Sequence, residues 1–278
     1  MEHIIHSLLD TLRLLPFLFL VYLLVEYFEH RNNGLLQGLF TKSKRLGPLL
    51  GATLGTIPQC GFSVVAAALF AKGAISPGTL IAIFIATSDE AIPLMITHPD
   101  KIADLGFVLI IKFLVALIAG FLIDLVLKKK TDREDIHHHH FHGNCENCEG
   151  GVLKSALIHS VKIFIYIFIV NVLIGYATEK LVSVMQLISE NMFVQSVLAV
   201  LFGSIPNCAA SVALTELYLA GKITVYSLIG GLCTGAGVGL LVLFKQNKNI
   251  KQNLCILVTL YGIGILVGLT MQYFAKII

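Results

Sequence analysis

The chain carries one short motif twice, and each copy lies inside a long apolar stretch. The first copy reads Gly55-Thr56-Ile57-Pro58-Gln59-Cys60-Gly61-Phe62-Ser63-Val64, and the second reads Gly203-Ser204-Ile205-Pro206-Asn207-Cys208-Ala209-Ala210-Ser211-Val212. The offset that carries Pro58 onto Pro206 also pairs identical residues as far as Ile81 and Ile229. Self-similarity at one fixed spacing predicts a fold made of two related halves.

The composition indicates the class of protein. Of 278 residues, 56% are hydrophobic and 13% are charged, whereas soluble domains carry about 25% charged residues. We therefore expect an all-α, multi-pass protein of the inner (plasma) membrane, in contact with the lipid bilayer. The start of the chain lacks a basic region followed by a small-residue cleavage site, so no cleaved signal is expected. Lysines and arginines lie between apolar segments, which argues against nucleic-acid binding.

The distribution of positive charge favours re-entrant hairpins at the two motifs. If all eight apolar segments cross the membrane, nine lysines and arginines fall on each side. If 46–72 and 192–220 instead enter and leave on one side, thirteen fall on one side and five on the other, as the preference of positive loops for the cytoplasm requires. The limbs 46–57 and 60–72 are each about 18 Å of helix, too short to cross.

This topology predicts an inverted repeat. Each half has three crossings plus one re-entrant helical hairpin, about ten helices in all when each limb is counted. The first membrane repeat is 1–127, the cytoplasmic His/Cys-rich linker is 128–151, and the second, inverted repeat is 152–278. Both termini are expected outside. The sequence leaves the formation of a homo-oligomer open.

The hairpin tips form the first candidate site. Irregular backbone at membrane depth is tolerated only inside protein or beside a water-filled cavity, and transporters built from two halves bind substrate at such positions. A pair of proline kinks with cysteines packed as small apolar residues is the alternative. The candidate substrate- or ion-binding residues at the tips are Pro58, Gln59, Cys60, Ser63, Pro206, Asn207, Cys208 and Ser211.

A second interruption follows each hairpin. Asp89 and Glu90 stand in an apolar stretch just before Pro93, and carboxylates at that depth mark ion pathways; a position at the outer interface is the alternative. The matching stretch of the second half has Cys233 and no acid. There the four-residue spacing of Gly231, Gly235 and Gly239 indicates close helix packing.

Three further ionisable groups have open assignments. Lys112 either pairs with Asp89 or Glu90 or extends outward. Glu216 is either an intramembrane acid or the end of the hairpin, and Asp124 is expected at the interface.

The linker carries a metal-binding pattern. Its ligand candidates are His137, His138, His139, His140, His142, Cys145 and Cys148. Imidazole and a C-x2-C pair suit zinc, copper, nickel or cobalt. A redox pair or a passive polar linker is the alternative. We expect the loop to gather or sense ions rather than to transport them.

The doubled motif, Thr87–Pro93 and the His-rich loop together resemble the ten-helix heavy-metal exporter family, over nearly the whole chain. Its members are labelled arsenic efflux protein or manganese transporter. The resemblance implies export of a heavy metal or metalloid. Trivalent arsenic prefers thiolates such as Cys60, Cys208 and Cys233, whereas manganese prefers oxygen ligands such as those of Asp89 and Glu90.

The expected function is secondary export of such an ion by alternating access, coupled to protons or another ion, because the chain has no nucleotide-binding G-x-x-x-x-G-K-[ST] motif. No cofactor is expected. The alternative is a membrane metal sensor that acts through the His/Cys-rich loop. An enzyme is not expected, because no histidine lies near Cys60 or Cys208 in sequence to activate a thiol.

Overall fold

The fold was analysed in a computed structural model that describes residues 46–57, 61–87, 91–131 and 192–277, with isolated positions at 19, 157, 161, 164, 165 and 169. All regular elements within these ranges are helices, which confirms the all-α class. In the part of the chain that the structure describes, four stretches are long and apolar enough to cross a membrane, as a multi-pass protein requires: Pro77–Ile96, Pro99–Leu127, Val225–Gln246 and Ile250–Ala275.

The described helices occur in matching order in the two halves. The first set is α3 (Gly47–Gly55), α4 (Gly61–Ala71), α5 (Pro77–Ala86), α6 (Ala91–Ile96), the 3-10 turn η1 (Pro99–Lys101) and α7 (Ile102–Thr131). The second set is α9 (Met192–Gly203), α10 (Cys208–Leu219), α11 (Val225–Thr234), α12 (Val238–Gln246) and α13 (Ile250–Ile277). At the offset that relates Pro58 to Pro206, α5 and α11 coincide at both ends, so the sequence repeat is also a repeat of helix boundaries.

Local sequence explains these boundaries. Ser76 and Thr224 precede α5 and α11, and each accepts a hydrogen bond from the amide three residues later, at 3.1 Å from Thr79 and 3.2 Å from Ser227. Hydroxyl side chains at this position satisfy an amide that the helix leaves unpaired. The α4 and α10 helices end before glycines in the left-handed region, Gly73 (φ 72°) and Gly221 (φ 69°), where other residues are strained.

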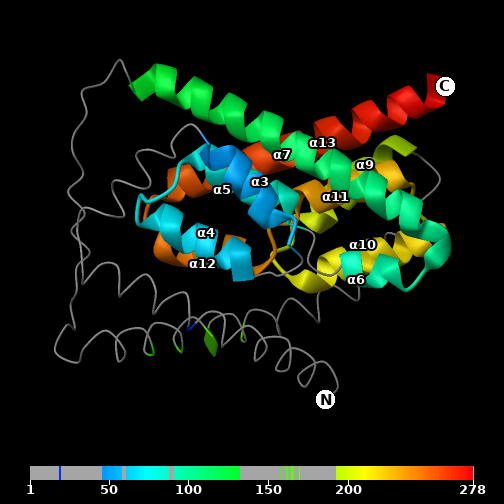
Figure 1. The fold of residues 1–278 in the computed structure, drawn as a ribbon, viewed down its shortest axis with the longest axis horizontal. Helices are drawn as coiled ribbons and strands as arrows, with labels where there is room; N and C mark the ends of the chain where they lie inside the picture. Colours follow the sequence, from blue (N-terminus) through cyan, green and yellow to red (C-terminus); the bar gives the residue numbers. More distant parts are fainter. Residues whose placement is uncertain are drawn as a thin grey trace.

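The two halves are interleaved rather than set side by side. The first limb of each hairpin packs on the broken helix of its own half, α3 on α5 and α9 on α11. The second limb packs on the broken helix of the other half, α4 on α12 and α10 on α6. The long helices α7 and α13 pack on α5 and α11 and cross each other over this core, running in opposite directions (Figure 1).

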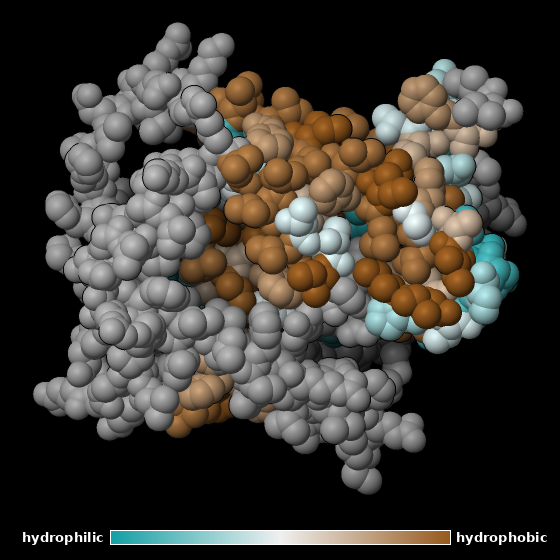
Figure 2. All heavy atoms as spheres, in the orientation of Figure 1, coloured by the Kyte–Doolittle hydropathy of each residue, from teal (hydrophilic) through white to brown (hydrophobic). Residues whose placement is uncertain are grey.

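The two hairpins lie at opposite ends of the molecule, and their tips point toward its middle (Figure 1). Large apolar side chains remain exposed on the outer helices, among them Ile110, Ile118 and Leu125 of α7 and Val258 and Leu266 of α13. Figure 2 shows apolar atoms over most of the coloured face and hydrophilic ones at the right-hand edge, where α6 leads into α7. Exposed apolar faces of this kind suit contact with lipid chains.

The spacing of Gly231, Gly235 and Gly239 does not lie on one continuous helix. α11 ends at Thr234, Gly237 has a positive φ of 52°, and α12 begins at Val238. Close packing is nevertheless confirmed for two of the three. A Cβ on Gly231 would lie 2.7 Å from the Ala199 carbonyl oxygen, and one on Gly239 would lie 2.7 Å from the Ser63 Cβ.

Candidate functional site at the hairpin tips and helix breaks

The end of the first hairpin limb, α3, packs against the end of α5. A Cβ on Gly55, the last residue of α3, would lie 2.7 Å from both the Ala86 Cβ and the Ile83 carbonyl oxygen. Only glycine permits this approach. Ile83 and Ala86 belong to the last turn of α5, so the end of α3 and the point where α5 stops are neighbours.

The second tip repeats this contact. A Cβ on Gly203, at the end of α9, would overlap the Gly231 carbonyl oxygen and would lie 2.9 Å from the Thr234 Oγ1. The Thr234 hydroxyl donates to the Val200 carbonyl at 3.0 Å. Each half therefore holds the end of a first hairpin limb against the last turn of a broken helix.

The tip hydroxyls bond within their own limb. Thr56 donates to the Thr53 carbonyl at 2.7 Å, and its counterpart Ser204 donates to the Leu201 carbonyl at 2.6 Å. Both bonds satisfy carbonyls of the last helical turn, which the helix itself leaves unpaired. These two hydroxyls therefore stabilise the tips.

The two halves meet through the second limbs. Ser63, near the start of α4, is fully buried and faces Gly239, near the start of α12. The first turns of α4 and α12 therefore pack against each other.

Lys112 lies beside the end of α5. It is fully buried, although it sits on α7, whose neighbouring residues are largely apolar. Its ammonium donates a hydrogen bond to the carbonyl of Thr87, the residue that ends α5. The outward orientation that the sequence left open is therefore wrong. Buried ammonium groups inside a membrane protein are costly and mark functional sites.

Cys233 lies at the helix break of the second half. Its side chain is fully buried in the last turn of α11. The sequence analysis included it among the candidate site residues.

The remaining predicted tip residues are placed only in part. Asn207 is nearly buried, and its side-chain oxygen caps α10 by accepting from the Ala209 amide at 3.1 Å. Ser211 and Pro206 are half-buried. Pro58, Gln59, Cys60, Asp89, Glu90, the Cys208 side chain and the linker ligands from His137 to Cys148 lie outside the described residues. Among the described residues, no group of three or more His, Cys, Asp or Glu side chains could hold a metal ion.

Two ionisable groups have clear positions. Glu216 is exposed in the last turn of α10, so it belongs to the end of the hairpin limb. Asp124 is half-buried and accepts hydrogen bonds from the Ser76 hydroxyl at 2.6 Å and from the Gly78 amide at 2.8 Å. It therefore anchors the start of α5 to α7.

The second half has a matching polar network that the sequence analysis missed. Gln272 of α13 donates to the Thr224 hydroxyl at 3.1 Å and to the Ser227 hydroxyl at 2.9 Å. The Ser227 hydroxyl also donates to the Gln195 Oε1 at 2.9 Å. Gln272 occupies the position that matches Asp124 when the two halves are aligned at the repeat offset. The sequence alignment of the halves therefore contained this pair, but an acid opposite an amide is not an identity and was not noticed.

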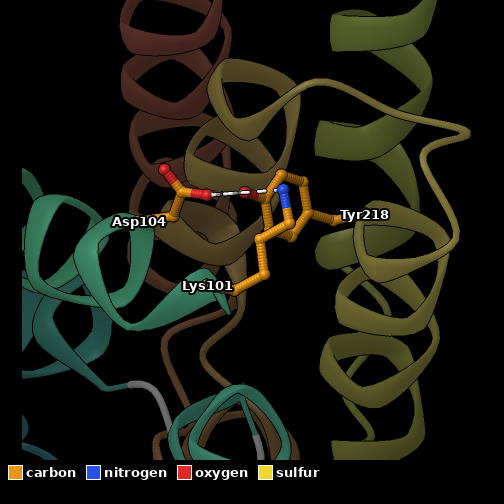
Figure 3. Close-up of polar contacts among 3 residues, drawn as sticks. All are labelled: Lys101, Asp104 and Tyr218. Carbon is orange, nitrogen blue, oxygen red and sulfur yellow. Dashed lines mark hydrogen bonds and ion pairs between the residues drawn. The ribbon is translucent and has the colours of Figure 1, made fainter. Parts of the chain in front are cut away.

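A third polar cluster joins the halves at one end. The Tyr218 hydroxyl on α10 donates to the Asp104 carboxylate on α7. Lys101 lies 3.7 Å from that carboxylate and 5.3 Å from the centre of the Tyr218 ring (Figure 3). The equivalent positions in the other half are Phe70, Gln252 and Asn249, so the cluster has no ionic counterpart there.

Comparison with known proteins identifies the family. Residues 3–189 match the family described as "Putative, 10TM heavy-metal exporter". That range is about two thirds of the chain, less than the nearly complete cover expected from the sequence, and it ends before α9. The chain belongs to this family. No curated protein and no solved structure matches it.

Proposed function

We propose that this protein is a secondary transporter that exports a heavy metal or metalloid ion across the plasma membrane by alternating access. The family to which the chain belongs is one of membrane exporters of heavy metals. The observation that supports the mechanism is that the first limb of each hairpin packs against a broken helix, Gly55 on the end of α5 and Gly203 on the end of α11, with Lys112 buried at the end of α5. Transporters of two related halves place substrate at broken helices near the midplane.

We propose that the halves are inverted and that the hairpins are re-entrant. The opposite ends from which α3–α4 and α9–α10 approach the middle support this topology, as do the opposite directions of α7 and α13. Lys72, Lys245, Lys248 and Lys251 lie in or beside loops at one end, whereas Lys101 and Lys222 lie at the other. The first end, and with it the His-rich linker, is then cytoplasmic, and both termini are outside.

In this mechanism the substrate lies between the tips and the breaks. Asp89 and Glu90, in the break after Thr87, supply carboxylates to a hard cation, with Gln59 and Asn207 as polar neighbours. Cys60, Cys208 and Cys233 supply thiolates to a soft one. Rocking of one half against the other opens the site to each side in turn, and exchange with protons or another ion drives export. The five linker histidines with Cys145 and Cys148 gather ions at the cytoplasmic entrance.

The direct test is growth of a host that lacks its own metal pumps, with and without this chain, on manganese, zinc, cobalt, nickel, copper, cadmium and arsenite. An exporter should raise tolerance to at least one ion and lower its cellular content. Deleting 137–148 should alter the concentration dependence and leave export intact. A strain that accumulates every ion as before would reject the proposal. Complete loss of function on deletion would favour a sensor.

A further inference from the structure

The turn between α12 and α13 carries positive charge that nearby acids do not neutralise. Lys248 and Lys251 are both exposed there, and Lys245 precedes them at the same spacing of three residues. Among the described residues, neither Lys248 nor Lys251 has an ion-pair partner. Residues 217–278 contain five lysines and no Asp or Glu, so this part of the sequence supplies no carboxylate to balance them.

Amide side chains hold the backbone of this turn in place. Asn253 is fully buried and donates to the Asn247 carbonyl oxygen at 3.0 Å. The Asn247 side chain donates in turn to the Asn253 Oδ1 at 2.8 Å and to the Gln252 Oε1 at 3.1 Å. Lys248 and Lys251 therefore project from an ordered backbone, which lowers the entropy lost when a ligand binds to them.

Lys251 stands at the start of an apolar stripe on α13. Leu254, which is 47% exposed, and Val258, which is 67% exposed, follow it by three and seven residues. Residues at this spacing lie on one face of a helix, and α13 is long and apolar enough to cross a membrane. A lysine in this position keeps its ammonium at the level of the lipid headgroups while its methylene groups lie against apolar surface.

The equivalent turn of the first half lacks this positive charge. At the repeat offset, Asp100 of η1 takes the place of Lys248. The lysine of that turn, Lys101, lies 3.7 Å from the Asp104 carboxylate. The long helix that follows, α7, nevertheless has exposed apolar residues as α13 does. An apolar outer face is therefore common to both halves, whereas an uncompensated basic turn next to it is particular to the second.

We propose that the turn between α12 and α13 binds an anionic phospholipid, with the headgroup phosphate held by Lys248 and Lys251 and the acyl chains lying along Leu254 and Val258. Charge complementarity favours this lipid over a zwitterionic one, because each lysine near the membrane surface attracts anionic headgroups. The apolar stripe next to the lysines favours a lipid over free phosphate. The inference does not depend on the export function proposed above.

The absence of tryptophan from the chain allows a direct test. Val258→Trp introduces a single indole on the stripe, and Ile110→Trp introduces one at the equivalent position of α7; the two native side chains are 67% and 61% exposed. The purified full-length protein is reconstituted in mixtures of phosphatidylcholine and phosphatidylglycerol, with bromine on the acyl chains of one lipid at a time. Brominated chains quench an indole that they contact, so the quenching gives the relative affinity of the two lipids at each position.

The expected result is a local preference that depends on the two lysines. In the Val258→Trp protein, phosphatidylglycerol should bind at least about fivefold more tightly than phosphatidylcholine. In the Ile110→Trp protein, the two lipids should bind within about twofold of each other. Combining Lys248→Gln and Lys251→Gln with Val258→Trp should reduce the preference to that level. The matched pair Lys248→Arg and Lys251→Arg keeps both charges and should keep the preference.

A salt titration gives a second measurement that needs no change to the lysines. At about 1 M salt the screening length is about 3 Å, so the preference at Val258→Trp should fall to within about twofold. Inorganic phosphate in excess over the lipid should leave the quenching unchanged. Displacement of the lipid by phosphate would make the turn a site for free anions and would overturn the proposal.

Three further outcomes would also overturn it. The first is the lack of any preference at Val258→Trp when both lysines are present. The second is a preference that survives the two glutamine substitutions or that is lost in the arginine pair. The third is an equal preference at Val258→Trp and Ile110→Trp, because phosphatidylglycerol would then gather around the whole protein rather than at this turn.

Discussion

Asp124 on α7 accepts a hydrogen bond from the Ser76 hydroxyl at 2.6 Å, and at the same position in the second half Gln272 on α13 donates to the Thr224 hydroxyl at 3.1 Å. Both pairs join the first residues of a broken helix to the long helix that covers it. The contact is shared although the chemistry differs, which indicates that both halves need this junction fixed.

The junction gives a prediction about stability. Asp124→Ala removes the acceptor for both Ser76 and the Gly78 amide, so it should lower the free energy of unfolding by about 2 kcal/mol. Asp124→Asn keeps one acceptor oxygen and should cost less. Thermal unfolding of the purified protein measures both, with Asp100→Asn in the exposed turn η1 as the control. Equal melting temperatures for all three would contradict an anchoring role.

The close approach of α9 to α11 gives a second prediction. Gly203→Ala places a methyl group on top of the Gly231 carbonyl oxygen, so the helices must separate, at a cost of about 1–3 kcal/mol or more. Gly262→Ala is the matched control, since nothing lies within 4 Å of that position, and it should stabilise α13 by about 0.5–1 kcal/mol. We expect the melting temperature to fall for Gly203→Ala and to rise for Gly262→Ala. An unchanged melting temperature for Gly203→Ala would mean that the contact between α9 and α11 is looser than described.

The proposed topology is tested by reporters at four loops. Insertions after Gly73 and after Asn249 should report the cytoplasmic side, as should one after Lys44, because the proposed topology places all three loops on the lysine-rich side. An insertion after Gly221 should report the outside. If the reporters at Gly73 and Lys44 appear on opposite sides, the first hairpin crosses the membrane, and the inverted arrangement fails with it.

The carboxylates in the first break give the fourth prediction. Asp89→Asn or Glu90→Gln should abolish driven export if that residue binds the cation or carries the coupling charge, while the protein still inserts and folds. Glu216→Gln is the control, since Glu216 is exposed at the end of α10. Full activity of the double variant Asp89→Asn, Glu90→Gln would place the ion path elsewhere.

The thiols give the fifth prediction. Replacement of a thiol by a hydroxyl exchanges a soft ligand for a hard one. For a thiophilic substrate, Cys60→Ser and Cys208→Ser should each lose most of the resistance in the growth assay. For a hard divalent cation such as manganese, the effect of both changes should be mild. Cys255→Ser, at an exposed position on α13, is the control for nonspecific effects.

The repeat made much of the fold predictable. Its constant offset located both hairpins, and limits drawn at 46–57 and 60–72 agree closely with the bounds of α3 and α4. The breaks were also expected, because Pro93 and the glycines near Gly235 interrupt apolar runs. Such residues act through local backbone geometry, which a single sequence does reveal.

The site was less predictable because it depends on which helix faces lie together. The sequence around Lys112 does not indicate whether its side chain faces α5 or lipid, because α7 has apolar residues on all sides. The network of Gln195, Ser227 and Gln272 joins residues on three helices through packing that the sequence does not encode locally. The sequence analysis missed the cluster of Tyr218, Asp104 and Lys101 for the same reason.

The interleaved packing also has a consequence for synthesis. α4 leaves the ribosome long before its partner, since α4 ends at Ala71 and α12 begins only at Val238. At the usual pace of chain elongation, that interval is on the order of 10 s. During it, α4 has α3 and α5 as its main neighbours among the described helices. The N-terminal half thus becomes complete only when the last two helices arrive, and a chain that stops after α11 would leave both halves unfinished.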